Sequence, residues 1–226
     1  ISHDPYIIIE GIIDIDGNII MPFNYSSISR ETDNKREIFV VTTEDEQSGI
    51  IDIHENTIVP IEYDYMFFWN SSLITVRNNS KYGVIDINNN KIIPIEYDDI
   101  SVANKEKGLV IVEKQDRRKT LVGMLNLNNQ VVIPIEYDKI HYENDSKIYT
   151  QKNGLWGMID INNRVITDFK LECDYIYSDA DNKYFIAEKN DICAIVTNTL
   201  EQVTDFEYSW ADAARKCKAM NKDEAA

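Results

Sequence analysis

One segment of about 20 residues recurs several times along this chain, and this repetition constrains the fold more than any single residue. Residues 48–66, 81–100 and 121–140 share a glycine, a proline eleven positions later and a tyrosine three positions after that. The glycines that open the copies are Gly11, Gly49, Gly83, Gly123 and Gly157, and Cys193 takes this place in a sixth, degenerate copy. A repeat of this length is one supersecondary unit used many times, so the sequence predicts an array.

Within one copy the side chains alternate as they do in β-strands. Ile85 and Ile87 fall on one face of the strand with Gly83, while Val84 and Asp86 fall on the other. Three asparagines at 88–90 tolerate left-handed backbone and predict a hairpin loop before the returning strand at 91–97. A further strand is predicted before each glycine, at residues 38–42, 73–77, 109–113, 148–151 and 184–187. Each unit is therefore expected to be a three-stranded meander.

The repeated glycine and proline have positional meaning. Glycine within a strand indicates a bulge or the close approach of another group, which in an array would be the neighbouring unit. Proline cannot donate to a β-ladder, so it is expected at an edge or a bend.

These residues resemble the bacterial WG repeat. The copy closest to that pattern is Trp-Gly-Met-Ile-Asp at 156–160, followed by Tyr-Gly-Val-Ile-Asp at 82–86. The other copies replace the tryptophan, with Glu10, Ser48, Tyr82, Val122 and Ile192 in its place. The resemblance covers residues 6–210 and implies an all-β repeat scaffold that binds a partner. It implies no catalytic residues.

The predicted fold is an all-β tandem array of six units, with residues 1–210 as a single repeat domain. An open superhelical array is favoured over a closed propeller-like ring, because propeller blades have four strands and three are counted here. Residues 211–226 are rich in alanine and charge and form a tail, predicted to be a short helix that caps the last unit or a frayed end.

The charge of the chain limits its partners. There are 39 acidic and 23 basic residues, a net charge of −16, which disfavours nucleic acid and favours a basic protein partner. No apolar run is long enough for a membrane span. Cys173, Cys193 and Cys217 have neither disulfide-framework nor metal-site spacing, which suits a reducing bacterial cytoplasm. The chain begins at Ile1, so an export leader or an upstream domain stays an open alternative.

The sequence contains no pattern typical of catalysis. His3, His54 and His141 have no ligand-type neighbours, and neither a nucleophile motif nor a phosphate loop occurs. We therefore expect no enzyme, no metal and no cofactor. A pocket that gathers His141 with carboxylates would reopen the enzyme hypothesis.

Three groups of residues are candidates for partner binding. The first is a stripe of carboxylates that follow the prolines. The second is an acidic loop, beside which the loop at Asn144 and Asp145 is a further candidate. The third is a group of aromatic residues, Phe67, Phe68 and Trp69, which interrupt the alternation and could instead belong to the core. The stripe comprises Glu62, Asp64, Glu96, Asp98, Asp99, Glu136 and Asp138, and the loop comprises Glu44, Asp45 and Glu46. The aspartates that follow tyrosine have a competing structural role, because they can bind turn amides.

Two functions are consistent with these features of the sequence. The first is a non-catalytic, acidic protein-binding scaffold, such as an immunity protein that neutralises a basic nuclease toxin, because nuclease surfaces must be cationic. The second is a recognition module of a larger envelope or cell-surface protein that binds peptide or glycan. The partner, the binding edge and the oligomeric state do not follow from the sequence.

Overall fold

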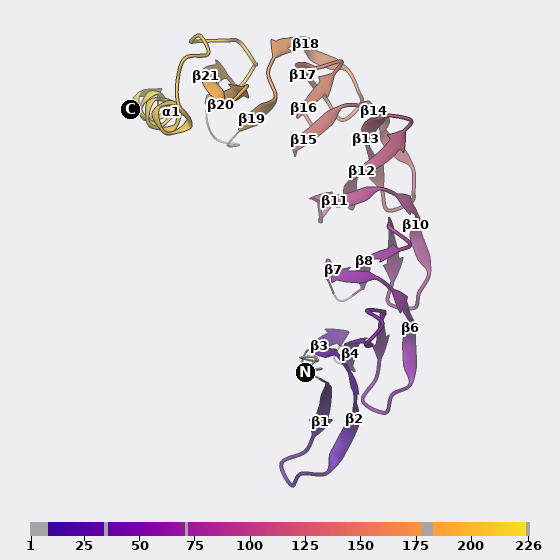
Figure 1. Ribbon diagram of the computed structural model, residues 1–226. Coiled ribbons are helices and arrows are strands. Elements are labelled where there is room, and N and C mark those ends of the chain that lie inside the picture. Colours follow the sequence, from indigo (N-terminus) through magenta and orange to yellow (C-terminus); the bar gives the residue numbers. More distant parts are fainter. Residues whose placement is uncertain (1–8, 34–35, 71, 178–182, 225–226) are drawn as a thin grey trace, which may run out of the picture. The chain divides into compact units, whose positions relative to one another are not determined.

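The computed structural model describes residues 9–33, 36–70, 72–177 and 183–224 of the chain (Figure 1). The described residues fall into two compact units, one within 9–110 together with 127–129 and the other within 111–126 and 130–224. Nearly all secondary structure is β, in six small sheets, and α1 (Trp210–Glu224) follows the last strand. The all-β repeat array predicted from the sequence is confirmed.

The strands follow one another within each sheet in chain order. The first sheet has two strands, β1 (Glu10–Ile13) and β2 (Ile19–Tyr25). Four sheets of four strands follow: β3 (Ser27–Asp33), β4 (Arg36–Thr42), β5 (Ser48–Ile51), β6 (Thr57–Tyr63); β7 (Tyr65–Phe68), β8 (Leu73–Asn78), β9 (Lys81–Asp86), β10 (Lys91–Tyr97); β11 (Asp99–Asn104), β12 (Leu109–Asp116), β13 (Lys119–Asn126), β14 (Val131–Tyr137); β15 (Lys139–Asn144), β16 (Lys147–Lys152), β17 (Leu155–Ile159), β18 (Val165–Glu172). The last sheet has three, β19 (Tyr175–Tyr177), β20 (Tyr184–Lys189) and β21 (Ile192–Thr197).

The four-stranded sheets add one strand to the predicted meander. The three expected strands of a unit are present, for example as β8, β9 and β10, and the added strand is the segment just after each tyrosine, such as β7 and β11. Because four strands are typical of propeller blades, strand number no longer separates an open array from a ring.

The repeated glycine lies opposite a bulge in the strand that carries the proline. Between the pairs Ile93–Val84 and Tyr97–Tyr82, β10 uses two more residues than β9. A Cβ on Gly83 would lie 2.7 Å from Cγ1 of Ile95 and 2.8 Å from the carbonyl oxygen of Ile93. The group that crowds this glycine is therefore the returning strand of the same sheet, not the neighbouring unit that we expected. Pro94 lies within the bulge, where a missing N–H is tolerated.

The aspartate of each Ile-Asp pair caps the hairpin that follows it. Oδ1 of Asp86 accepts 2.8 Å hydrogen bonds from the amides of Asn88 and Asn90, and the Asn90 side-chain amide donates to Oδ2 at 2.7 Å. Asn89 takes the left-handed backbone that the turn requires, with φ of 64°. The hairpin predicted from the asparagines is thus confirmed, and Asp86 has a structural role.

Adjacent residues of the middle strands are buried on opposite faces of their sheet, because within a compact unit successive sheets stack face to face. Ile50 packs in a cluster with Ile74 and Ile85 of the next sheet, while Ile51 packs with Met21 of the previous one. Both isoleucines are fully buried. Such strands need continuous apolar runs rather than strict alternation.

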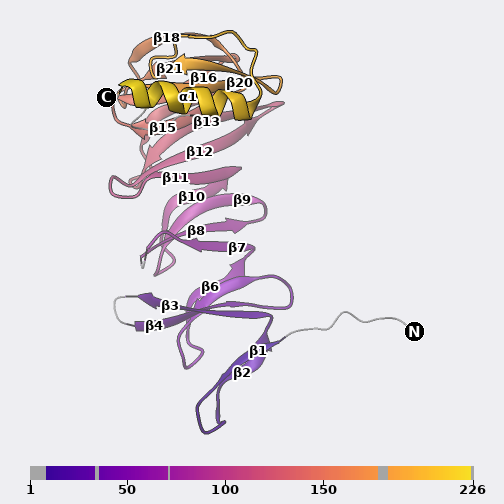
Figure 2. The same cartoon turned by 90° about the vertical axis from the view of Figure 1, so that its left-hand side faces the viewer.

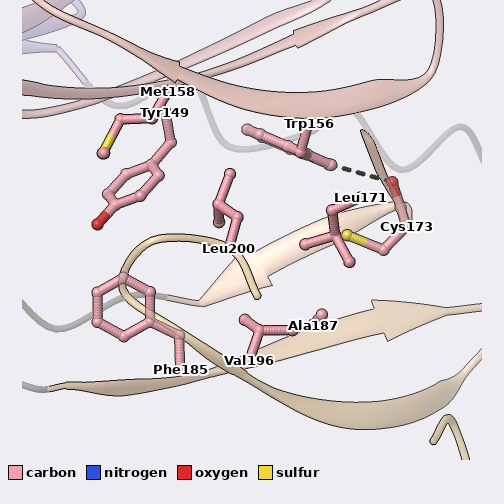
Figure 3. Packing of buried hydrophobic residues seen from close by; sticks show 9 residues of the cluster. All are labelled: Tyr149, Trp156, Met158, Leu171, Cys173, Phe185, Ala187, Val196 and Leu200. Atoms are coloured by element: carbon pink, nitrogen blue, oxygen red, sulfur yellow. Dashed lines mark hydrogen bonds between the residues drawn. The ribbon is translucent and has the colours of Figure 1, made fainter. Parts of the chain in front are cut away.

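In the second unit, the sheet β15–β18 packs on the sheet β19–β21 through a cluster that Figure 3 shows. Tyr149, Trp156 and Phe185 are its large side chains, and the Tyr149 and Phe185 rings meet edge to face at 5.7 Å. The Trp156 indole N–H donates a 3.1 Å hydrogen bond to the carbonyl oxygen of Cys173 (Figure 3). The tryptophan of the Trp-Gly pair is therefore a core residue with its polar atom satisfied.

The last sheet is covered by α1, which lies across it in Figure 2. Ser209 caps the helix, since its hydroxyl oxygen accepts a 3.3 Å hydrogen bond from the amide of Asp212. Ala213 and Cys217, four residues apart, are buried against this sheet, and Asn221 exchanges 3.0 Å hydrogen bonds with the backbone of Tyr184. Of the two expectations for the tail, the capping helix is the one that the structure contains.

Candidate functional site

The aspartate that follows the repeated tyrosine has structural partners in the second unit. Asp138 forms an ion pair with Lys119 at 2.5 Å and accepts the Gly154 amide at 3.0 Å. Burial opposes ionisation of this carboxyl, but the hydrogen bonds from Lys119 and Gly154 outweigh it and lower the pKa of Asp138. Asp138 lies in the connection between β14 and β15. Its side chain thus binds Lys119 beside the β12–β13 hairpin and Gly154 in the β16–β17 hairpin, which belong to successive sheets.

The equivalent aspartates of the first unit are engaged in the same region. The Lys81 ammonium donates to Oδ1 of Asp98 at 2.6 Å, and the Gln47 side-chain amide donates to Oδ1 of Asp64 at 3.2 Å. These contacts favour the structural role over the binding role for the predicted stripe at its aspartates. They leave Asp99 and the glutamates of the stripe, which stand one residue before each tyrosine.

The three glutamates of the stripe, Glu62, Glu96 and Glu136, occupy the same position in β6, β10 and β14, and all are exposed. Glu136 forms an ion pair with Lys152 at 2.9 Å. An exposed pair of this kind contributes little to stability, so its carboxylate can exchange partners readily.

The predicted acidic loop is an exposed turn between β4 and β5. Glu44, Asp45 and Glu46 are all exposed, and Glu46 has a left-handed φ of 60°. The neighbouring Gln47 contacts Asp64, so this turn lies beside the end of β6. The structure thus brings the loop and part of the stripe together. In the other loop, Asp145 accepts a 2.6 Å hydrogen bond from the Tyr142 hydroxyl, which holds the hairpin.

An aromatic cavity of about 390 Å³ joins the remaining candidates, and we call it the β7–β11 cavity. Phe67 and Trp69 line it with Asp99, the first residue of β11. Tyr65 and Tyr82 complete the aromatic wall, their rings edge to face at 6.5 Å. The two edge strands of successive sheets therefore enclose an aromatic site with a carboxylate.

Polar contacts hold two residues that line the β7–β11 cavity. Trp69 is 6% exposed, and its indole N–H donates a 2.7 Å hydrogen bond to the Thr75 hydroxyl. The Lys105 ammonium donates to the carbonyl oxygen of Trp69 at 3.2 Å. By contrast, Phe67 is 50% exposed, so the aromatic residues divide between core and surface.

Sequence reasoning missed Tyr65, Tyr82 and Lys105 as lining residues. A signal for the first was present, because Tyr65, Phe67 and Trp69 alternate with a period of two, as in a strand with one aromatic face. The aromatic residues therefore do not interrupt an alternation; they belong to the added strand β7 and the residue that follows it. No local signal links them to Asp99, which lies in another sheet.

The described residues hold no group of three or more histidines, cysteines or carboxylates placed to bind a metal ion. Cys173, Cys193 and Cys217 are buried free thiols. Burial raises the pKa of Cys173 to about 12, aided by the charge of Asp174, so the thiol stays protonated at neutral pH. His141 packs near the ring of Tyr149 at 6.2 Å and does not line the β7–β11 cavity. In the part of the chain that the structure describes, no helix is both long and apolar enough to span a bilayer.

Comparisons with known proteins add the following. Curated proteins include no match to this chain. Similar solved structures include a functionally unknown protein from Desulfotomaculum acetoxidans, with 11% identity over 80% of this chain and 69% of that one and a TM-score of 0.40. Hsv2 of Kluyveromyces lactis has 13% identity over 88% and 67%, with a TM-score of 0.41. Dihydro-heme d1 dehydrogenase NirN has 12% identity over 86% and 48%, with a TM-score of 0.45, so this chain spans about half of its length.

A family of sequence repeats matches at three positions. Residues 49–82, 82–117 and 123–156 match the family described as WG containing repeat. These stretches include the glycines Gly49, Gly83 and Gly123 and the prolines Pro60, Pro94 and Pro134 that define the copies. The chain therefore contains WG repeats at these three positions.

Proposed function

We propose that this chain is a non-catalytic binding module for a basic protein, and that it serves as an immunity protein against a bacterial nuclease-type toxin. The observation that carries the proposal is the net charge of −16 on a chain whose repeat residues have structural roles. Charge of this size and sign attracts a cationic partner and repels nucleic acid.

The carboxylates divide by role in a way that supports this proposal. Asp86 caps a hairpin, and Asp98 and Asp138 pair with lysines of the scaffold. The exposed turn at Glu44–Glu46 is not part of the repeated pattern, and it lies beside the end of β6. Residues that vary between copies can be changed without disturbing the array, so they suit the recognition of one partner.

A nuclease offers a surface of matching charge. It must hold phosphates with lysines and arginines, so an acidic protein can cover that surface and exclude the nucleic acid. Long-range attraction would speed the encounter, which matters for an inhibitor that must act before the toxin does.

Co-purification tests this proposal. The full chain carrying an affinity tag is expressed from its native operon, and the proteins that elute with increasing salt are identified by mass spectrometry. We expect a basic protein encoded beside this chain to elute at high salt. Elution of no basic protein, or retention of a cell-wall glycan or a neutral protein instead, would contradict the proposal.

A further inference from the structure

We propose that the β7–β11 cavity binds the lysine or arginine side chain of a basic protein segment. This inference rests on the proposed function and names the place where one cationic side chain of the partner would anchor.

The walls suit an organic cation that carries an aliphatic stem. Tyr65, Phe67 and Tyr82 offer aromatic surface, and Tyr65 and Phe67 are 44% and 50% exposed. Aromatic faces attract lysine and arginine through the quadrupole of the ring, while the methylene groups of these side chains bury apolar surface. An acidic or a small polar side chain would gain neither interaction.

The rim supplies a negative charge. Asp99 is exposed, and Oδ1 accepts a 2.9 Å hydrogen bond from the amide of Ile100. Within the described ranges, no lysine or arginine forms an ion pair with this carboxylate. Lys105 also lines the cavity, but its ammonium is held by the carbonyl oxygen of Trp69. An entering cation would therefore pair with Asp99.

The second unit contains the contact that we propose, formed within the chain itself. The ammonium of Lys139 lies 3.8 Å from the ring centroid of Tyr175 and donates to the carbonyl oxygen of Asp174 at 2.8 Å. Lys139 and Tyr175 are the first residues of β15 and β19. Tyr65 and Asp99 are the first residues of β7 and β11, which are the equivalent first strands of two earlier sheets.

The equivalent strands of the β7–β11 cavity carry different residues from those of the internal contact. Where β15 and β19 bring a lysine against a tyrosine, β7 and β11 bring a tyrosine and a carboxylate. The aromatic and anionic parts of the arrangement are both present. The Arg77 guanidinium lies 5.8 Å from the centroid of the Tyr82 ring, so an entering cation would use the exposed rings of Tyr65 and Phe67. Tyr65 and Phe67 of β7 are too exposed to be explained by core packing. Binding of a cationic side chain would account for their position.

The test uses pentapeptides with glycine at every position except the centre, which is arginine, lysine, norleucine or glutamate, with both ends blocked. Binding to the full chain is followed by the indole N–H resonances of its three tryptophans in ¹H–¹⁵N NMR spectra. The Trp69 resonance is identified by its loss in Trp69→Phe. We expect the arginine or the lysine peptide to shift this resonance, and the norleucine and glutamate peptides to leave it unchanged.

Variants separate the cavity from the rest of the surface. Asp99→Asn should weaken binding roughly three- to fivefold, the size expected for the loss of one exposed charge pair. Phe67→Ala should weaken it further. Tyr175 is the first residue of β19 and is therefore equivalent to Asp99 in β11. Tyr175→Ala should bind the peptides as the unmodified chain does. The Trp156 and Trp210 resonances report in each variant whether the fold is kept.

Equal shifts with norleucine and arginine, or full affinity in Asp99→Asn, would overturn the inference. So would the absence of a shift with both cationic peptides. These outcomes differ from failure of the proposed function, because the peptides need no natural partner. A basic protein captured equally well by the unmodified chain and by Asp99→Asn would reject this anchor and leave the proposed function standing.

Discussion

The hydroxyl of Tyr63, the last residue of β6, donates a 2.7 Å hydrogen bond to Oδ1 of Asn89 in the hairpin of the next sheet. The same contact recurs in the second unit, from Tyr137 to Asn163 at 2.6 Å. In both cases the acceptor residue has a left-handed backbone, with φ of 64° at Asn89 and 60° at Asn163. The repeated tyrosine therefore links its sheet to the next one by a hydrogen bond to an asparagine in the next sheet's hairpin. The turn of that hairpin sets the backbone conformation of the asparagine.

Tyr63→Phe should lower the free energy of unfolding by about 1 kcal/mol, the usual net contribution of one hydrogen bond. The ring is 1% exposed and would keep its packing, so the change isolates the hydroxyl. Urea denaturation followed by circular dichroism measures the effect. Tyr65→Phe, in which the hydroxyl removed belongs to an exposed tyrosine, serves as the control and should leave the midpoint unchanged. Equal midpoints for Tyr63→Phe and the unmodified chain would contradict this role.

Much of the fold follows from the sequence because its determinants are local. A short β-branched run, Val84 and Ile85, that ends at Asp86 and is followed by three asparagines is sufficient to predict a hairpin. The added strand β7 was missed because its residues, Tyr-Met-Phe-Phe, follow a tyrosine and look like an inserted aromatic group. Its identity as a strand depends on pairing with β8, which is not a local property.

The candidate site was less predictable than the fold for the same reason. The acidic turn is visible in the sequence because Glu44, Asp45 and Glu46 are consecutive. The β7–β11 cavity forms only when two sheets stack, which brings Phe67 near Asp99. Likewise the partners of Asp98 and Asp138 are residues of other strands, so their structural role could be named as an alternative but not assigned.

The Asp86 cap should make stability depend on pH in the acid range. Partial burial would raise the pKa of Asp86, but the hydrogen bonds from Asn90 and Asn88 outweigh it, so the folded-state pKa lies below the ordinary value of an aspartate. A group whose pKa is lowered by folding adds stability above its unfolded pKa. That stability is lost as the pH falls through the folded value.

Asp86→Asn should therefore narrow the difference in stability between neutral and acidic solution. The amide can form the same turn, since Asn126 accepts the Gln130 amide at 3.0 Å in the equivalent hairpin. Thermal denaturation between pH 7 and pH 2 measures this, with Asp116→Asn, at an exposed hairpin residue, as the control. Parallel profiles for Asp86→Asn and the unmodified chain would show that the cap does not titrate as we describe.

Asn221→Ala should loosen α1 from the last sheet. The Asn221 side chain accepts a hydrogen bond from the Tyr184 amide and donates one to the Tyr184 carbonyl oxygen, both at 3.0 Å. Each of these hydrogen bonds contributes about 0.5–1.5 kcal/mol to the free energy of unfolding. Hydrogen exchange at the Tyr184 amide should become faster. Lys218→Ala, on the exposed side of the helix, should not change it. Unchanged protection of Tyr184 in Asn221→Ala would mean that α1 is held by its apolar contacts alone.

The most direct test of the proposed function is the salt dependence of binding, measured by titration calorimetry between the full chain and the basic protein encoded beside it. We predict that the dissociation constant rises steeply with salt, and that replacing Glu44, Asp45 and Glu46 with Gln, Asn and Gln flattens this rise. Replacing Glu201, Asp205 and Glu207 in the same way changes the net charge equally and should have a smaller effect. An affinity that does not change with salt, or the same loss in both triple variants, would contradict the account.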